Sequence, residues 1–293
     1  MQMNDDNGQL SESSRLNDTQ KLILSIMEEL VKIFDRMGIP YYMQGGTMLG
    51  AVRHQGFIPW DDDIDIGVFR EDYERLVAEI DDYLPEHLKL RTYWDETDHH
   101  YYFSRIVDTR YRIKRMGSME VRYENVWIDI FPLDGMPNGK IARAWHKVRL
   151  LTHRVKYHLA SLNKVNVKRP GRPLVERIII KVAAVTRIGS WFNARKELDK
   201  VDRLLKKYPI SGSDWIVNFM GQTSYKFNEL FRKEVYGKIT YYPFEHLRLP
   251  GPEQYDAYLK SLYGDYMTPP RECDRNAHAA ELVRGDVDPN GEV

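Results

Sequence analysis

The sequence predicts an α+β protein whose core is interrupted by a basic helical insertion. Residues 16–37 repeat apolar side chains at helical spacing, which predicts one long helix. Residues 63–68 instead alternate Ile64, Ile66 and Val68 with Asp or Gly, the period-2 pattern of a strand with one apolar face. Between residues 140 and 207 nearly every charged residue is basic, and helical patterns follow one another. We therefore expect a core of sheet and helices with a positively charged helical segment inserted into it.

The composition agrees with a folded protein and excludes several kinds of site. The 293 residues are 42% hydrophobic and 12% aromatic, which is enough to bury a core. Lysine plus arginine equals aspartate plus glutamate at 43 each, so net charge selects no partner. A single cysteine excludes an internal disulfide and a cysteine-rich zinc site. The chain shows neither a signal-peptide pattern nor an apolar run of the ~18 residues that span a bilayer, which predicts a cytoplasmic protein.

The first half of the chain is expected to place helices and strands around a glycine pair. Asn17 or Asp18 caps the first helix, and Gly38 ends it. The further elements expected here are a strand at 41–43, a helix at 47–53, a helix at 71–83, and strands at 88–93, 101–107 and 126–131. Pro132 and the Asp134–Gly135 pair are expected to close this half.

The rest of the chain divides by composition. Helices are expected at 141–162, 174–191 and 193–208, and short strands and loops follow, with a helix at 253–263. The predicted division is a disordered tail at 1–15, a catalytic core at 16–137, the basic helical insertion at 138–210, a C-terminal part at 211–283 that completes the core, and a tail at 284–293.

The acidic strand is the first candidate for chemistry. Asp63 and Asp65 are one residue apart on a predicted strand, so their side chains point to the same face. Carboxylate oxygens are ligands that Mg²⁺ prefers in proteins. Such a site needs a third carboxylate from a neighbouring strand, and Asp129, flanked by apolar strand residues, has the required form.

The glycine pair is the second candidate. Gly45 and Gly46 let the backbone approach a phosphate closely, and the helix that follows offers free N–H groups and a positive dipole end. Thr47 adds a hydroxyl group. A glycine pair with a threonine is by itself an ordinary turn, and Asp129 alone is an ordinary strand residue. The glycine pair with Thr47, the acidic strand and Asp129, in this order along the chain, together indicate chemistry on a phosphate with metal ions.

A calcium-binding loop is the main alternative for the acidic stretch. Asp61, Asp63 and Asp65 imitate the first three ligand positions of such a loop, and Asp72 lies near the last one. The sixth position of that loop requires glycine, and Ile66 stands there. The isoleucine alternation also favours a strand.

The sequence resembles the LicD-type phosphotransferases, a family that includes bacterial phosphorylcholine transferases and is similar to fukutin-related ribitol-phosphate transferase. The resemblance rests on residues 46–54 and 57–65, on 127–135, and less specifically on 242–245, 263–267 and 269–270. It covers both ends of the chain, and the basic middle carries no recognised motif.

The resemblance implies a nucleotidyltransferase-type mixed sheet flanked by helices. It implies transfer of a phospho-alcohol from a CDP-linked donor to a sugar hydroxyl of a cell-surface polysaccharide, teichoic acid or lipopolysaccharide precursor, with release of CMP and with Mg²⁺ or Mn²⁺ as cofactor. By position, Asp63 and Asp65 are implied as metal ligands, and Asp129 as a ligand or general base. Gly45, Gly46 and Thr47 are implied as phosphate-binding residues, and Asp61 is a second-rank candidate.

Secondary features each have a functional and a purely structural interpretation. Arg53 and His54 follow the glycine turn and are candidates to bind the donor phosphate, or they form a helix-end pair that contacts carbonyls. Arg105 is a candidate for a further phosphate contact, but we expect it to be an exposed strand residue. Aromatic residues beside acids, the ingredients of a quaternary-ammonium cage, are expected to be packing residues instead; they are Trp94, Asp95, Tyr101 and Tyr102.

The basic insertion has three interpretations. It is a solvated helical face, a nucleic-acid surface, or a surface for an anionic membrane. No nucleic-acid motif accompanies it, so we expect no nucleic-acid partner. A solvated helical face is the default. The apolar stripe at 174–192 with its neighbouring basic residues leads to the hypothesis of peripheral contact with the inner face of the cytoplasmic membrane, near a lipid-linked glycan acceptor.

Two other functions remain open from the residues. A glycosyltransferase would use Asp63 and Asp65 as its metal motif on a nucleotide sugar, although the glycine turn and Asp129 argue against it. A non-enzymatic module would bind calcium or a polyanion through the acidic loop or the basic helices.

Overall fold

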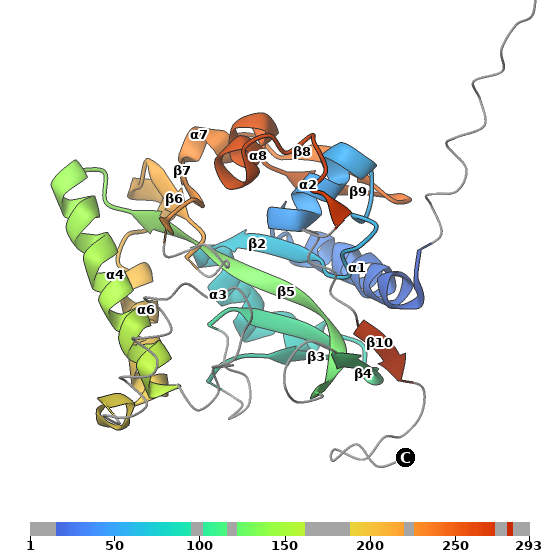
Figure 1. Ribbon diagram of the computed structural model, residues 1–293, viewed down its shortest axis with the longest axis horizontal. Coiled ribbons are helices and arrows are strands. Elements are labelled where there is room, and N and C mark those ends of the chain that lie inside the picture. Colours follow the sequence, from blue (N-terminus) through green and yellow to red (C-terminus); the bar gives the residue numbers. More distant parts are fainter. Residues whose placement is uncertain are drawn as a thin grey trace, which may run out of the picture.

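The computed structural model describes residues 16–94, 102–115, 122–161, 188–219, 226–272 and 280–283 (Figure 1). Helices flank a mixed sheet, which confirms the predicted α+β class. The helices are α1 (Asp18–Met37), α2 (Gly45–His54), α3 (Arg70–Glu79), α4 (Lys140–Ala160), α6 (Ala194–Leu205), α7 (Lys233–Tyr236) and α8 (Tyr255–Tyr263), with 3-10 turns η1 (Ile80–Asp82), η3 (Ile188–Trp191) and η4 (Ile210–Gly212). The strands are β1 (Tyr42–Met43), β2 (Asp65–Phe69), β3 (Leu88–Arg91), β4 (Ser104–Arg115), β5 (Arg122–Met136), β6 (Trp215–Val217), β7 (Leu230–Arg232), β8 (Thr240–Phe244), β9 (Leu247–Gly251) and β10 (Ala280–Val283).

The main sheet has the strand order β1-β2-β5-β4-β10. β2 and β5 run parallel, and the other neighbours in this order are antiparallel. β3 pairs with β4, and β6 and β7 continue the sheet from the C-terminal end of β5. The parallel pair sets the register of the site, because it places Asp65 directly opposite Asp129.

The helices bring distant parts of the chain to the glycine turn. α1 and α3 pack against β5 of the sheet. α2 contacts β2, α8 and the hairpin formed by β8 and β9 (Figure 1). Residues near position 258 therefore lie beside residues near position 45. The main apolar core joins all of these elements.

The caps of α1 agree with the sequence. The Asn17 side chain accepts a hydrogen bond from the Gln20 N–H at 2.8 Å, and the Gln20 side chain accepts one from the Asn17 N–H at 3.0 Å. This reciprocal pair satisfies two N–H groups that the first helical turn leaves without partners. Gly38, at φ 62°, ends the helix in the left-handed conformation, as predicted.

The strand expected at 126–131 is longer than predicted, because neither Pro132 nor the Asp134–Gly135 pair ends it. β5 continues through these residues to Met136, because Pro132 pairs with Val68 in the parallel ladder and Gly135 pairs with β6. Gly135 serves close packing rather than a turn: a Cβ there would lie 2.3 Å from the Tyr208 carbonyl oxygen.

Two boundaries also shift at the site. The helix expected at 47–53 begins at Gly45, so the glycine pair is its first turn and not a preceding loop. The strand expected at 63–68 begins at Asp65, and Asp63 lies in the extended segment before it. The ladder nevertheless reaches further back, because the Asp129 N–H donates to the Ile64 carbonyl at 3.1 Å.

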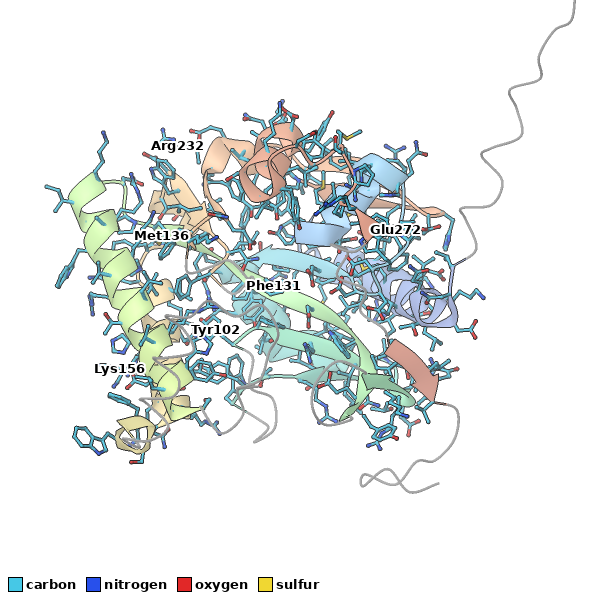
Figure 2. All side chains as sticks on the ribbon, viewed as in Figure 1. Tyr102, Phe131, Met136, Lys156, Arg232 and Glu272 are labelled. Atoms are coloured by element: carbon cyan, nitrogen blue, oxygen red, sulfur yellow. The ribbon has the colours of Figure 1, made fainter. Side chains whose placement is uncertain are left out.

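The helices α4 and α6 pack on each other and on the sheet through a second apolar cluster. Its members come from β5, α4, α6 and the region of β6, and include Met136, Leu150, Leu198, Val201 and Phe219. Tyr102 belongs to the same cluster and lies between these helices and the sheet (Figure 2). The insertion thus shares buried contacts with the sheet.

Some predictions fall outside the described residues. They are the two tails, the helix at 174–191 apart from η3, and most of the apolar stripe at 174–192. The domain boundaries stay a prediction. None of the helices in the described ranges combines the length and hydrophobicity that crossing a bilayer requires.

Candidate active site

The glycine turn opens α2 with two backbone donors directed away from the helix. Gly45 has φ 48°, a left-handed conformation that favours glycine, and its N–H donates to the Tyr258 hydroxyl at 3.0 Å. The N–H groups of Gly46 and Thr47 have no hydrogen-bond partner within the described part of the chain. Unpartnered N–H groups at a helix N-terminus are a suitable environment for an anionic group.

Thr47 connects the glycine turn to the acidic strand. Its side chain is 3% exposed, and its hydroxyl oxygen accepts a hydrogen bond from the Asp65 N–H at 2.8 Å. The oxygen of Thr47 therefore fixes α2 against the start of β2. Thr47 contributes to this arrangement through its side chain, and its backbone N–H has no partner among the described residues.

The carboxylates gather around the glycine pair. A Cβ on Gly46 would lie 2.9 Å from Asp61 Oδ2, and one on Gly45 would lie 3.6 Å from Asp65 Oδ2. Any side chain at Gly46 would therefore displace Asp61. Glycine at both positions keeps the backbone next to the carboxylates.

The electrostatic state of Asp65 shows how densely charged this site is. Burial raises the pKa of Asp65 well above its usual range, and the negative charges of Asp63, Asp129, Asp61 and Glu229 raise it further, in that order. The ionised carboxylates repel one another, because like charges at short range disfavour ionisation. A cation or a cation-bound phosphate would relieve this repulsion.

Asp129 and Arg105 form a cross-strand ion pair beside Asp65. The two residues are direct partners in the β4–β5 ladder, and Arg105 Nε donates to Asp129 Oδ1 at 2.7 Å. Arg105 is 9% exposed and its guanidinium stacks on Trp127, 4.3 Å from the ring centroid. The expectation of an exposed arginine is wrong, because an inward-facing carboxylate directly opposite draws the guanidinium into the sheet.

Arg53 and His54 lie at the other end of α2 from the glycine turn. Arg53 donates to the Tyr266 carbonyl at 2.7 Å, which agrees with the carbonyl-contact interpretation, although the carbonyl belongs to a distant segment. Burial lowers the pKa of Arg53, and the neighbouring Tyr263 raises it. Burial and the Arg53 charge lower the pKa of His54, whose ring lies 6.2 Å from that of Trp60.

Three residues that sequence patterns did not indicate complete the site. Tyr263, at the end of α8, is 45% exposed, and its hydroxyl would lie 3.6 Å from a Cβ on Gly45. Glu229 precedes β7, and burial raises its pKa to about 7, while a hydrogen bond with Asn218 lowers it. Tyr258 holds Gly45, as described above. Only Tyr263 stands in a stretch that the sequence resemblance covers.

The aromatic residues near position 94 pack against each other, as expected. The ring centroids of Tyr93 and Trp94 are 4.7 Å apart, and those of Tyr93 and Tyr102 are 5.6 Å apart. The Tyr102 hydroxyl is bound between Arg70 at 2.9 Å and Asp202 at 2.5 Å. Tyr102 therefore serves a structural network. Asp95 and Tyr101 lie outside the described residues.

The calcium-loop alternative is incompatible with the fold. From Asp65 to Phe69 the chain is a sheet strand paired with β1 and β5 and cannot wrap around an ion. Within the described ranges, no three His, Cys, Asp or Glu side chains stand close enough together to hold a metal ion as they are placed. Mutually repelling carboxylates would have to draw together around a cation.

Comparison with known proteins identifies the domain that contains this site. Residues 38–167 match the LicD/FKTN/FKRP nucleotidyltransferase domain. The chain is 28% identical over 264 residues to the lipopolysaccharide cholinephosphotransferase LicD of Haemophilus influenzae, covering 90% of this chain and 95% of that protein. It is 44% identical over 43 residues to the human ribitol 5-phosphate transferase FKRP, and 31% identical over 55 residues to human FKTN. These two matches cover 15% and 19% of this chain, and 9% and 12% of the relatives.

The matched segment includes the glycine turn, the acidic strand and Asp129, which are the parts that carried the resemblance in the sequence. The chain therefore carries a nucleotidyltransferase domain of the LicD/FKTN/FKRP family.

Proposed function

We propose that this chain is a metal-dependent phosphotransferase that moves a phospho-alcohol from a CDP-linked donor to a sugar hydroxyl of a polysaccharide or its precursor. Phosphocholine is the first group to test, because the relative that matches most of this chain's length is a lipopolysaccharide cholinephosphotransferase. The observation that carries the proposal is the crowding of Asp61, Asp63, Asp65 and Asp129 beside the free N–H groups of α2.

The glycine turn is suited to the donor diphosphate. The N–H groups of Gly46 and Thr47 and the positive end of α2 would bind phosphate oxygens. Gly45 cannot use its N–H in this way, because Tyr258 accepts it. Arg53 is a neighbour of Tyr263, which in turn borders Gly45, so Arg53 is a second-rank phosphate ligand.

The acidic cluster is suited to a hard divalent cation. Asp63 and Asp65 would supply carboxylate oxygens, the donor type that Mg²⁺ and Mn²⁺ prefer, and the Asp129 oxygen that Arg105 does not hold would serve either as a third ligand or as the general base. A bound cation would also relieve the repulsion among these carboxylates. When bound, the metal ion would offset the charge of the diphosphate. Asp61 borders Gly46, and we infer that it orients a ligand of the same site.

Asp129 is the candidate general base. One of its oxygens is held by Arg105, which fixes the orientation of the carboxylate and leaves the second oxygen for the acceptor. In the proposed step, the acceptor hydroxyl oxygen bonds to the phosphorus that carries the alcohol, and the bond from that phosphorus to the CMP oxygen breaks. The hydroxyl proton passes to Asp129, and CMP leaves.

Substitution of the carboxylates tests the proposal. Asp63→Asn and Asp65→Asn should fold normally and lose on the order of 10³-fold or more of the transfer rate, because each removes a metal-binding carboxylate. Asp81→Asn, which changes an exposed carboxylate on η1, is the matched control and should keep wild-type activity. Near-wild-type turnover of either site variant would contradict the proposal.

The donor screen separates the rival functions. The wild-type chain would be incubated with Mg²⁺ and CDP-choline, CDP-ribitol, CDP-glycerol or nucleotide sugars, and thermal stabilisation and CMP release would be measured. We expect a CDP-alcohol to stabilise the protein and to yield CMP. Stabilisation by a nucleotide sugar alone would favour a glycosyltransferase, and stabilisation by calcium without any nucleotide would favour a binding module.

A further inference from the structure

The outer face of α4 carries an unusual concentration of exposed apolar side chains. Of the ten large apolar side chains exposed within the described residues, four are on α4 and a fifth, Trp191, is in η3. The α4 residues are Ile141, Trp145, Val148 and Val155, which are 88%, 65%, 52% and 56% exposed. Contiguous exposed apolar side chains on a folded protein mark a surface for a partner or a membrane.

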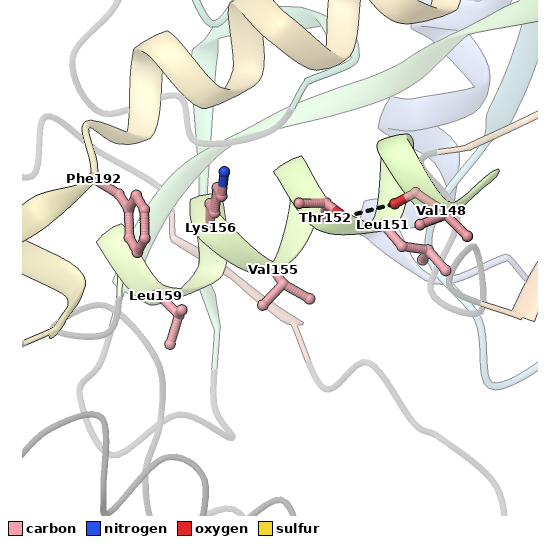
Figure 3. Close-up of a pocket in the computed structure, with 7 residues that line it drawn as sticks. All are labelled: Val148, Leu151, Thr152, Val155, Lys156, Leu159 and Phe192. Atoms are coloured by element: carbon pink, nitrogen blue, oxygen red, sulfur yellow. Dashed lines mark hydrogen bonds between the residues drawn. The ribbon is translucent and has the colours of Figure 1, made fainter. Parts of the chain in front are cut away.

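These side chains form one straight stripe. At about 100° per residue, positions 141, 145, 148, 152, 155 and 159 fall within about 40° of one line along the helix. The stripe extends for about 27 Å, the length of 18 residues at about 1.5 Å each. Leu151, Val155 and Leu159 point to one side of α4 and, with Phe192, line a shallow groove there (Figure 3). We call the residues Ile141, Trp145, Val148, Val155 and Leu159 the α4 stripe; Leu151 lies at its edge and also packs against the second apolar cluster.

The α4 stripe is not the face by which the helix is held in the fold. His146 and Leu150, 2% and 0% exposed, point into the protein on the opposite side of α4. Leu150 belongs to the apolar cluster shared with β5 and α6. α4 therefore has two apolar faces, one packed and one open.

The charge of α4 identifies the chemistry of what covers the open face. The helix contains six lysines and arginines and no aspartate or glutamate. By the same helical geometry, Arg149 and Lys156 lie along one border of the stripe, and Lys140 lies along the other. Glu197, the acidic residue that contacts α4, is bound on the packed side by His153 and Lys200.

This arrangement disfavours a second copy of the chain and favours an anionic surface. Two α4 helices packed through their stripes would bring basic borders against basic borders, which costs free energy. An apolar stripe with tryptophan and basic borders matches the interface of a bilayer that contains anionic lipids. We propose that α4 lies in the plane of an anionic membrane, with the α4 stripe in the acyl boundary and its basic borders at the headgroups.

The position of α4 leaves the candidate active site open in this orientation. α4 lies at one side of the molecule, and α2 with the glycine turn lies near the opposite side (Figure 1). Membrane contact through α4 therefore covers neither the glycine turn nor the acidic cluster. The proposal does not depend on the proposed reaction, and lipid binding can be measured without a donor.

Vesicle flotation of the full chain tests the proposal. Vesicles of phosphatidylcholine with about 30 mol % phosphatidylglycerol would be compared with pure phosphatidylcholine at roughly 0.1 M salt. We expect the chain to float with the anionic vesicles and to stay behind with the neutral ones. No flotation with the anionic vesicles would overturn the proposal.

Two variants of α4 and one control locate the surface. Trp145→Ser/Val148→Ser/Val155→Ser removes the centre of the stripe, and Lys140→Glu/Arg149→Glu reverses two exposed border charges. Each should weaken vesicle binding at least about tenfold. The control, Ile239→Ser, removes an exposed apolar side chain elsewhere and should bind as the wild type does.

The use of two α4 variants keeps the test valid if one of them misfolds. Thermal unfolding identifies a variant that fails to fold, and the charge variant alters only exposed side chains, so it tests the proposal even if the triple variant unfolds. Undiminished binding by a folded α4 variant would overturn the proposal. A dimer without lipid that the triple variant abolishes would assign the stripe to self-association instead and would also overturn it.

Discussion

The contact between Tyr258 and Gly45 gives a sharp test of how the C-terminal helix supports the glycine turn. Tyr258 is fully buried, accepts the Gly45 N–H at 3.0 Å and donates to Gln44 Oε1 at 3.1 Å. Tyr236 is equally buried and donates to the same Gln44 oxygen at 3.2 Å, but it does not contact Gly45. The two tyrosines are a matched pair that differs in one hydrogen bond.

The expected losses of unfolding free energy in the two Tyr→Phe variants follow from this difference. Tyr236→Phe removes one hydrogen bond and leaves Gln44 Oε1 bound to Tyr258, so it should cost about 0.5–1.5 kcal/mol of unfolding free energy. Tyr258→Phe removes a similar bond and leaves the Gly45 N–H without its partner, which should cost about 1–3 kcal/mol more. At about 2–4 °C per kcal/mol for a protein of this size class, the melting temperatures of the two variants should differ by several degrees.

The kinetic comparison separates a local effect from general destabilisation. Because Gly45 positions the donors of Gly46 and Thr47, Tyr258→Phe should raise the KM for the CDP-linked donor more than Tyr236→Phe does. KM and kcat would be measured well below both melting temperatures, where both variants are folded. Equal melting temperatures and equal KM values in the two variants would refute the reasoning.

Three further outcomes are expected from buried groups. Burial, with the charges of Arg149 and Lys207, lowers the pKa of His146 to about 4, so the unfolded chain binds more protons than the folded chain between about pH 4 and 6.5. The unfolding free energy should therefore fall as pH is lowered through that window, by up to about 1.4 kcal/mol per pH unit. Urea unfolding at several pH values measures this dependence, and His146→Leu should make it weaker. Asp134→Ala should cost about 3–5 kcal/mol of unfolding free energy, because it removes the carboxylate to which the buried Arg70 donates at 2.6 and 2.8 Å. Arg70→Met should cost less in the Asp134→Ala background than in the wild type, and a double-mutant cycle measures this coupling. Gly46→Ala should leave the unfolding free energy unchanged or up to about 1 kcal/mol higher, while its Cβ displaces Asp61 and lowers the transfer rate at least about tenfold; a variant with wild-type turnover would contradict the placement of Asp61.

The sequence allowed the prediction of those site residues whose geometry is local. The alternation of acid and isoleucine around Asp65 and the helix that begins at the glycine pair depend on neighbouring residues only, although Asp63 precedes the strand. Asp129 was recognisable because apolar strand residues surround it, and its register opposite Asp65 then follows from the parallel pairing. Metal binding by these carboxylates stays a prediction.

Residues whose role depends on distant pairing were not predictable. Arg105 resembles any strand arginine until the β4–β5 register places it opposite Asp129. Glu229 stands in a turn without periodicity, and its burial results from how β6 and β7 extend β5. Tyr258 follows the pattern of a helix core residue, and the sequence contains no indication that its hydroxyl meets the backbone 213 residues earlier.

The basic helices are predicted to be an insertion, and buried polar contacts bind α6 to the strands of the site. Arg70 follows the last residue of β2, and its guanidinium is held by Asp134 of β5 and, at 3.4 Å, by Asp202 of α6. Tyr102 closes the same network by donating to Asp202. Because a charged group buried without its partners is costly, α6 cannot leave the sheet without exposing Arg70 and Asp134 to that cost. A contact that orients α4 on a surface, through the apolar cluster it shares with α6, therefore also orients the strands that carry Asp65 and Asp129.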